Sequence, residues 1–253
     1  MLLSAEHVTL RFGGLIAVND VSLGVKEGII TGLIGPNGAG KTTFFNCLSG
    51  VYAPEKGGKI IFNGKNIEGK RGFQVCEAGI ARTYQIINLF RSMTVLENVI
   101  VGMHKNLKAG YWSALFRLPS QREEEEKAFE KAYDLLDYFG LKHRANDPAG
   151  SLPYGEQRLL EIVRGFATDP KLLLLDEPAA GMNMTEKNNL DSLLRKIISR
   201  GVTILIIEHD MKLMMGVADY IYVLAGGKLL AEGTAEEVQN NPDVITAYLG
   251  GDI

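Results

Sequence analysis

Residues 35–43, with the sequence GPNGAGKTT, restrict the fold of this chain more than any other feature. They have the form G-x-x-x-x-G-K-[ST] of a phosphate-binding loop. Residues 28–34 before the loop are mostly apolar and β-branched, which predicts a buried strand, and residues 42–48 after it carry apolar side chains at helical spacing. Glycines let backbone N–H groups turn toward an anion, and the N-terminus of a following helix adds positive potential there. The pattern therefore predicts a nucleotide-binding α/β domain.

The composition narrows the class of protein. The net charge is −3 and the pI is about 5.9. These overall values do not suggest a basic surface that binds nucleic acid. Cys47 and Cys76 form no C-x-x-C pair, which suits a reducing compartment and argues against a disulfide scaffold. No apolar run approaches the ~20 residues that span a bilayer, and no signal peptide is visible. We therefore expect a cytoplasmic protein, which is compatible with docking on a membrane partner.

Short strands are predicted on both sides of the loop. Residues 2–12 and 17–25 have strand-like patterns, which predict an antiparallel subdomain beside a parallel sheet. Four consecutive leucines at 172–175 and the apolar run 202–207 predict two fully buried strands. The remaining predicted elements are a strand followed by a turn at 57–65, a strand at 80–85, a hairpin at 220–231, and helices at 185–200 and 234–248.

A helical subdomain is predicted at residues 94–167. Thr94 and Glu97 have capping-box spacing, which predicts a helix within 93–103, and residues 121–139 have an amphipathic pattern. A turn at 151–158 leads into a helix that ends at Ala167. Residues 104–120, with Trp112, are either a docking surface for a partner or ordinary subdomain core, and the second is favoured. We expect one domain over residues 1–253 that contains this helical part.

Several polar residues occupy positions suited to phosphate chemistry. In the loop, Lys41 would reach the β- and γ-phosphates and the Thr42 hydroxyl would bind Mg²⁺. Asp176 and Glu177 end the leucine strand, where an acid can bind Mg²⁺ and a neighbouring acid can orient or deprotonate water. An N-cap role would explain one of these acids but not both. His209 follows the second buried strand, and this placement favours a functional role over a structural one.

The order of these motifs resembles that of the ATP-binding subunits of ABC transporters. The loop, Gln85, the stretch 152–158, Asp176-Glu177 and His209 follow one another as in that family, and the resemblance covers essentially the whole chain. More narrowly, the chain is similar to the ATP-binding subunits of branched-chain amino acid importers. The segments that support this are 11–15 (RFGGL), 46–48 (NCL), 108–116, 178–181 (PAAG), 208–211 (EHDM), 241–244 (NPDV) and 247–250 (AYLG).

The resemblance implies a P-loop ATPase fold with a mostly parallel core sheet, an N-terminal antiparallel subdomain and a helical subdomain. It implies that Glu177 is the catalytic base, that His209 holds the γ-phosphate, and that Gln85 senses Mg²⁺, the attacking water and the membrane partner. Mg²⁺ would be held by Thr42, Gln85 and Asp176. The residues expected to bind ATP are Phe12, stacked on the adenine, Val18, Gly35, Pro36, Asn37, Gly38, Ala39, Gly40, Lys41, Thr42 and Thr43, with Tyr154, Gly155 and Glu156 of the signature motif.

Two motifs depart from the family pattern. The signature Leu-Ser-Gly-Gly-Gln is Leu152-Pro153-Tyr154-Gly155-Glu156 here, so the serine hydroxyl and one glycine are absent while the Gly155 N–H remains. The loop Ser-Ala-Leu-Asp after the two acids is Ala180-Gly181-Met182-Asn183, so an amide replaces a carboxylate. Both departures affect contacts that the family makes across a dimer.

The expected function is an ATPase that powers import of branched-chain amino acids through a head-to-tail dimer holding two ATP molecules. The expected partners are membrane-spanning permease subunits, a second ATP-binding chain and, indirectly, a solute-binding protein, with no nucleic acid. The expected location is the cytoplasmic face of the inner membrane. The alternatives are an ATPase for another cargo, such as urea or an outer-membrane lipid, an ABC protein acting on DNA or ribosomes, and a non-hydrolysing regulator. Glu177 and His209 argue against the last.

Overall fold

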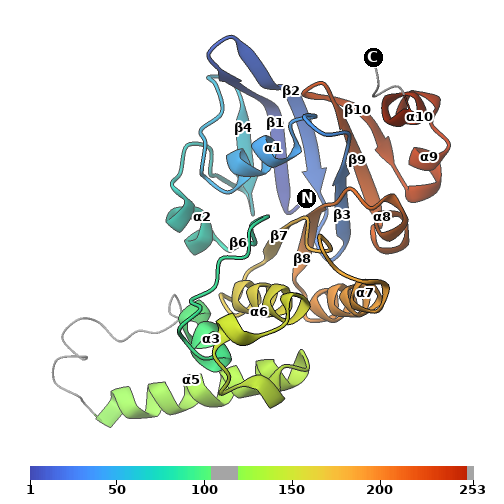
Figure 1. Ribbon diagram of the computed structural model, residues 1–253. Coiled ribbons are helices and arrows are strands. Elements are labelled where there is room, and N and C mark those ends of the chain that lie inside the picture. The colour runs from blue at the N-terminus through green and yellow to red at the C-terminus, as the bar shows by residue number, and fades with distance from the viewer. Residues whose placement is uncertain (104–118, 250–253) are drawn as a thin grey trace. The chain divides into compact units, whose positions relative to one another are not determined.

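The computed structural model of the chain describes residues 1–103 and 119–249 (Figure 1). The chain divides into two compact units. The first combines residues 1–85 with residues 171–253, and the second consists of residues 86–170. The second unit is therefore an insertion in the sequence of the first, and each is described by itself.

The first unit contains a six-stranded sheet in the order β10-β9-β3-β8-β7-β6. Strands β9, β3, β8, β7 and β6 are parallel, and β10 pairs antiparallel with β9 at one edge. Every residue of β3, β7 and β8 is buried, which explains the continuous apolar runs that predicted them. The bounds are β3 Ile30–Ile34, β6 Ile80–Arg82, β7 Leu172–Asp176, β8 Thr203–Ile207, β9 Tyr220–Ala225 and β10 Lys228–Gly233.

A four-stranded antiparallel sheet in the order β2-β1-β4-β5 belongs to the same unit. Its strands are β1 Leu3–Phe12, β2 Leu15–Val25, β4 Lys59–Phe62 and β5 Lys65–Asn66. Helix α1, Lys41–Leu48, buries Phe44, Phe45 and Leu48 in a core cluster that contains side chains of both sheets. The predicted α/β fold with an antiparallel subdomain is confirmed.

Five further helices complete the described part of the first unit: α2 Gly72–Ala78, α7 Met184–Ser199, α8 Met211–Val217, α9 Ala235–Gln239 and α10 Pro242–Leu249. Helix α7 buries Leu190, Leu193, Leu194 and Ile197, four of the five residues predicted for its apolar face, while Ile198 is only partly buried. The sequence patterns predicted neither α2 nor α8. Both are seven residues long, so neither repeats an apolar face often enough to be recognised.

Strand β6 is shorter than predicted. The predicted strand at 80–85 ends at Arg82, so Gln85 lies outside the sheet. The Thr83 N–H still donates to Leu174 O, but the Asp176 N–H donates to the Thr83 hydroxyl instead of a backbone carbonyl. The side chain thus replaces the backbone at the next position of the ladder, and regular pairing stops there.

The second unit is helical where it is described. Its helices are α3 Val95–Met103, α5 Pro119–Tyr138 and α6 Tyr154–Phe166, with single 3-10 turns at Lys142–Arg144 and Ala149–Ser151. The capping box at the start of α3 is present, because Thr94 N donates to Glu97 Oε2 at 2.7 Å and Glu97 N donates to Thr94 Oγ1 at 3.1 Å. The prediction for residues 104–120 falls almost entirely outside the described residues. The boundaries predicted at 94 and 167 lie inside this unit.

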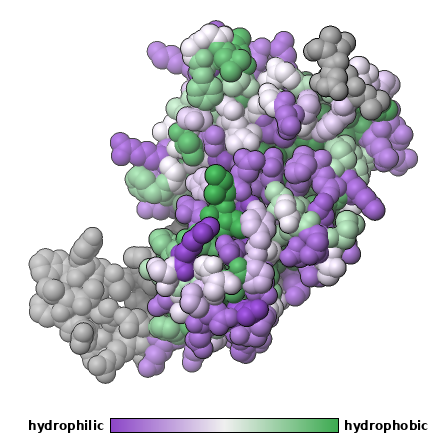
Figure 2. Space-filling view, in the orientation of Figure 1, coloured by the Kyte–Doolittle hydropathy of each residue, from purple (hydrophilic) through white to green (hydrophobic). Residues whose placement is uncertain are grey.

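Hydrophilic residues dominate the face of the molecule seen in Figure 2, with hydrophobic side chains in small groups among them. None of the helices in the described ranges combines the length and the apolar character that crossing a bilayer requires.

Candidate active site

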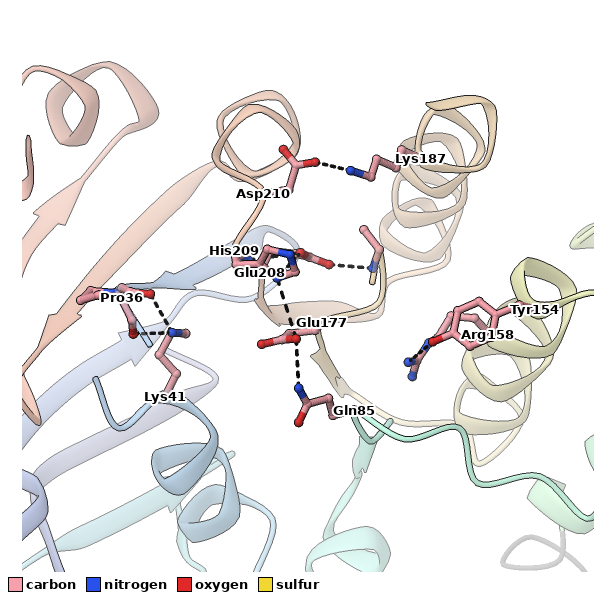
Figure 3. A network of polar contacts seen from close by, with 12 residues as sticks. Pro36, Lys41, Gln85, Tyr154, Arg158, Glu177, Lys187, Glu208, His209 and Asp210 are labelled. Carbon is pink, nitrogen blue, oxygen red and sulfur yellow. Dashed lines mark hydrogen bonds and ion pairs between the residues drawn. The ribbon is translucent and has the colours of Figure 1, made fainter. Parts of the chain in front are cut away.

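The phosphate-binding loop connects β3 to α1 and carries a buried lysine. Lys41 is the first residue of α1, and its ammonium donates to Gly35 O at 2.7 Å and Pro36 O at 2.9 Å (Figure 3). Burial lowers the pKa of Lys41 below its ordinary value, while the negative charges of Glu177 and Asp176 oppose that shift. The lysine therefore lies among the groups that sequence reasoning assigned to phosphate and metal.

Two glycines of the loop have no room for a side chain. A Cβ on Gly35, which has φ +150°, would lie 2.1 Å from Leu224 O, and one on Gly40, with φ +94°, would lie 2.4 Å from Ala17 O. Gly40 is also the N-cap of α1 and supplies no side-chain cap. The first N–H groups of the helix thus have no side-chain acceptor at the cap, which is the arrangement that receives a phosphate.

A cavity of about 620 Å³ opens over the loop. Its lining combines the loop and α1 with the end of β1 and the start of β2: Phe12, Leu15, Ile16, Ala17, Asn37, Gly38, Ala39, Gly40, Lys41, Thr42, Thr43, Gln85, Glu177, Gly226 and Gly227. The lining holds polar groups at the loop and apolar side chains at the opposite end. This division suits a ligand with a charged phosphate end and a flat apolar end, which is the chemistry of a nucleotide.

The apolar end is built differently from the sequence-based expectation. Phe12 is 45% exposed, and its ring lies 5.3 Å from the ring of Tyr52 in an edge-on contact. Val18, expected to bind ATP, is fully buried in the core and does not line the cavity. Leu15 and Ile16 line it instead, since the first residues of β2 are exposed while Val18 points inward.

Asp176 is almost completely buried at the end of β7. Its Oδ2 accepts from Arg82 Nη2 at 2.9 Å, and its N–H donates to the Thr83 hydroxyl at 3.3 Å. Arg82 is the last residue of the neighbouring strand β6, and Thr83 follows it. The two chain segments are therefore joined by one contact between side chains and one between a side chain and the backbone. Sequence reasoning found Asp176 and missed Arg82, because nothing in a short stretch such as Ile80-Ala81-Arg82 indicates a partner 94 residues away.

Glu177 lies between Gln85 and His209 (Figure 3). Its Oε2 accepts from Gln85 Nε2 at 3.2 Å and lies 3.8 Å from His209 Nδ1. Its backbone has φ +48°, the left-handed region that non-glycine residues seldom adopt and that is concentrated at functional sites. The structure thus brings together Glu177, Gln85 and His209, three of the residues that were predicted to be catalytic.

Glu208 is a buried carboxylate that sequence reasoning did not single out. Its Oε1 accepts from Ala179 N at 2.7 Å and its Oε2 accepts from His209 N at 3.2 Å. Burial raises the pKa of Glu208, and these hydrogen bonds and the nearby His209 oppose the rise. Glu208 therefore fixes the segment after Glu177 to the segment that carries His209.

The helices that follow these two segments are also linked. Asp210 caps α8 through a bond from Leu213 N, and it pairs with Lys187 of α7 at 2.5 Å. The hydrogen bond between them lowers the pKa of Asp210 and raises that of Lys187. Asn183 caps α7 in a capping box with Glu186. The amide that replaces a carboxylate in the family pattern thus has a structural task in this chain.

The donor set at the loop fits Mg²⁺ only in combination with phosphate. Within residues 1–103 and 119–249, no three His, Cys, Asp or Glu side chains gather as a metal site. Thr42 and Gln85 line the cavity with oxygen donors, and Asp176 is close enough to Lys41 to affect its pKa. Mg²⁺ prefers oxygen ligands and is commonly held by one or two carboxylates together with substrate phosphates. The residues present fit a Mg²⁺ ion that arrives with a nucleotide.

The signature motif opens helix α6 in the second unit. Pro153 is the N-cap and forms no side-chain cap, and Tyr154 occupies the position of the family's first signature glycine. Arg158, fully buried, donates to the Tyr154 hydroxyl at 3.3 Å and pairs with Glu161 at 2.9 Å, while Glu161 also accepts from Asn88 N. The tyrosine is therefore tied to its own helix through its hydroxyl.

Comparison with known proteins settles the family. Residues 18–180 match the sequence profile described as ABC transporter, and residues 228–253 match that described as branched-chain amino acid ATP-binding cassette transporter. The chain belongs to the ABC transporter family. It is 50% identical to the high-affinity branched-chain amino acid transport ATP-binding protein LivG of Escherichia coli K12 and 48% identical to BraF of Pseudomonas aeruginosa, in both cases over 98% of each chain.

Solved structures of ATP-binding cassettes have the same fold as this ABC chain. A nucleotide-free cassette from an ABC transporter superposes with a TM-score of 0.84 at 33% identity, and a cassette in its ADP conformation with 0.85 at 33% identity. Each comparison covers 98% of both chains. The predicted P-loop ATPase fold and the ATPase activity of a transporter subunit are confirmed.

Proposed function

We propose that this ABC ATPase is the ATP-hydrolysing subunit of an importer for branched-chain amino acids. The observation that carries the proposal is the near-complete coverage of both chains in the comparisons with LivG and BraF, together with the family-specific match at residues 228–253. The chain would lie on the cytoplasmic face of the membrane and bind there to separate permease subunits. A solute-binding protein would deliver the amino acid from the other side.

The residues of the cavity account for binding of ATP. Phe12, which makes an edge-on contact with Tyr52, would stack on the adenine. Leu15 and Ile16 would form the adjoining apolar wall. The phosphates would lie against the N-terminus of α1. Lys41 would exchange its bonds to Gly35 O and Pro36 O for bonds to the β- and γ-phosphates, which are stronger because both partners are charged.

The residues around Glu177 account for hydrolysis. Glu177 would accept the proton of the attacking water, and the bond from Gln85 orients its carboxylate. His209 would donate to the γ-phosphate, and Glu208 fixes the backbone of that histidine. Thr42, Gln85 and Asp176 would hold Mg²⁺. When bound, Mg²⁺ neutralises charge that develops on the phosphate oxygens.

A second copy of the cassette, or a related one, would complete each site. The signature residues Tyr154, Gly155 and Glu156 would meet the γ-phosphate bound by the other chain. Gly155 has an N–H and no Cβ, so it can approach a phosphate closely, whereas Pro153 has no N–H to donate. This arrangement is a head-to-tail dimer with two ATP molecules at its interface.

Transport measurements with the whole importer test the proposal. The chain would be co-expressed with its permeases and reconstituted in vesicles with the solute-binding protein, and ATP hydrolysis would be measured with leucine, isoleucine, valine or urea. We expect stimulation by the branched-chain amino acids and none by urea. Glu177→Gln is the matched control, since it keeps the shape of the side chain and should bind ATP without hydrolysing it. Stimulation by urea alone would show that urea, and not a branched-chain amino acid, is the transported solute. Hydrolysis by Glu177→Gln at the wild-type rate would show that Glu177 is not the base.

A further inference from the structure

Arg82 makes polar contacts with two elements of the first unit, helix α1 and strand β7. Its side chain is 5% exposed. Nη1 donates to Asn46 Oδ1 at 2.7 Å and to Ser49 Oγ at 2.6 Å, both at the C-terminal end of α1, and Nη2 donates to Asp176 Oδ2 at 2.9 Å. One planar group thus joins the helix that follows the phosphate-binding loop to the acid at the end of β7.

Two aromatic rings restrict the orientation of that guanidinium. Its central carbon lies 5.7 Å from the centre of the Phe45 ring and 5.0 Å from the centre of the Tyr84 ring. Arginine can stack on rings and still donate in several directions within its plane, whereas lysine is a point charge without such a plane. The surroundings therefore select the shape of arginine as well as its charge.

The energetics of buried ion pairs point away from a simple stabilising role. Taking two charges out of water is costly, and the pair commonly adds little net stability over apolar side chains of similar size. Here one member of the pair is the acid Asp176 itself. The ion pair gives this acid a definite orientation, which two apolar side chains would not provide.

We propose that Arg82 is a positioning residue that fixes the Asp176 carboxylate relative to α1, so that the carboxylate can act on the cation of the bound nucleotide. The proposal rests on the role in binding Mg²⁺ proposed above for Asp176. Because Arg82 ends β6 and Gln85 follows three residues later, the same contact fixes the start of the segment that carries Gln85.

Positioning and simple charge compensation predict opposite results when the arginine is removed. A positive charge next to Asp176 weakens the attraction of that carboxylate for a cation. If Arg82 only compensates charge, its removal should tighten binding of a divalent cation. If Arg82 positions the carboxylate, its removal should weaken that binding, because the oxygen no longer lies where the cation needs it.

The affinity of the ADP-saturated protein for Mn²⁺ distinguishes positioning from charge compensation, and its measurement requires no ATP hydrolysis. Free Mn²⁺ would be measured by electron paramagnetic resonance, and ADP affinity in EDTA would be measured with a fluorescent analogue. For Arg82→Met we expect ADP affinity in EDTA within about twofold of wild type and Mn²⁺ affinity about tenfold weaker. Arg82→Lys keeps the positive charge but lacks the planar guanidinium, so its Mn²⁺ affinity should lie between those of Arg82→Met and the wild type.

Controls make each outcome decisive. Arg195→Met removes a half-exposed arginine that pairs with Asp191 and Asp219, and it should leave Mn²⁺ affinity unchanged. If Arg82→Met does not fold, Asn46→Ala loosens the guanidinium without changing charge and should weaken Mn²⁺ binding about threefold. Unchanged or tighter Mn²⁺ binding in the folded variant overturns the proposal. A wild-type protein that binds ADP but no Mn²⁺ overturns the metal role of Asp176 itself, and leaves ATP binding and the assignment to an importer untouched.

Discussion

Lys41 is held by its own loop in the ABC site. Its ammonium donates to two carbonyl oxygens of that loop, and the residue is 7% exposed. These bonds keep the ammonium at the loop proposed to receive the phosphates, where a phosphate would offer it a charged acceptor.

Lys41→Ala should lower ATP affinity at least tenfold. The variant loses hydrogen bonds to a charged acceptor, a class that contributes about 1.5–3 kcal/mol. Isothermal titration calorimetry measures the affinity, and Lys65→Ala, at an exposed position on β5, is the control that should bind as the wild type does. Equal ATP affinities for Lys41→Ala and the wild type would show that Lys41 does not bind the phosphates.

Glu208 should make the stability of the protein depend on pH. Because burial raises the pKa of Glu208 in the folded protein, the unfolded chain loses this proton at a lower pH than the folded protein does. The contribution of this group to the free energy of unfolding is therefore fully present below its ordinary pKa and falls as pH rises through the folded value. Glu208→Gln does not titrate. Urea unfolding of both proteins from pH 4 to pH 8 should show the wild type losing stability relative to the variant, whereas a constant difference would contradict the assignment.

At the residue scale, the sequence allowed prediction of groups with a recognisable spacing. The loop, Glu177, Gln85 and His209 were all found in this way, and the structure brings Glu177, Gln85 and His209 together. Arg82 and Glu208 were not found, because their partners lie far away in the chain and their neighbours have no distinctive pattern. Val18 was expected to bind ATP, yet β1 and β2 pair with bulges, Val18 is buried in the core, and Leu15 and Ile16 line the cavity instead. Register at a bulge is decided by packing that one strand's sequence does not contain.

At the element scale, the ends of the strands and the caps of the helices arrange the site. Asp176 ends β7, Glu177 follows it, and His209 follows β8. The helix after each segment begins with a side-chain cap, Asn183 for α7 and Asp210 for α8. Long apolar strands and long amphipathic helices could be predicted from their periodicity. The end of β6 at Arg82 and the seven-residue α8 could not, since so few residues define no period.

The cap of α7 gives a prediction in which two substitutions should differ. Asn183 accepts from Glu186 N at 3.0 Å, and loss of an N-cap acceptor costs about 1 kcal/mol. Asn183→Ala should therefore lower the free energy of unfolding by about that amount. Asn183→Asp should keep the stability, because aspartate caps as well as asparagine does. Chemical denaturation of both variants measures the difference, and equal losses would mean that the side-chain cap contributes nothing.

The turn from β3 into the loop gives a second element-scale prediction. Gly35→Ala places a Cβ against the backbone of β9, which cannot move without breaking the pairing of β3 with β9. We expect a folded but destabilised protein with little ATP binding. Gly14→Ala is the control, since its Cβ would meet nothing within 4 Å. Wild-type ATP affinity in Gly35→Ala would show that the loop tolerates a different path.

At the scale of the whole molecule, a head-to-tail dimer predicts that two inactive variants restore each other. Gly155→Asp places a negative charge where the γ-phosphate of the other chain would lie, and Lys41→Ala disables the loop of its own chain. In a mixed dimer, one site combines an intact loop with an intact signature. ATP hydrolysis should be absent in each variant alone and return on mixing, with monomer ATP affinity nearly intact in Gly155→Asp. Weakened monomer binding in Gly155→Asp would place the signature in its own chain's site, against the dimer.

The position of β3 at the centre of its sheet has a consequence for biosynthesis. Its two neighbours, β8 and β9, are residues 203–207 and 220–225, so this buried apolar strand is translated long before either of them. At about 5–20 residues per second, the delay of roughly 190 residues lasts on the order of 10–40 s. During that time the nascent chain presents an apolar strand with unpaired edges, which other chains can pair with. Conditions that slow elongation should therefore increase aggregation of this cassette on the ribosome, and chains truncated before residue 220 should accumulate as insoluble material.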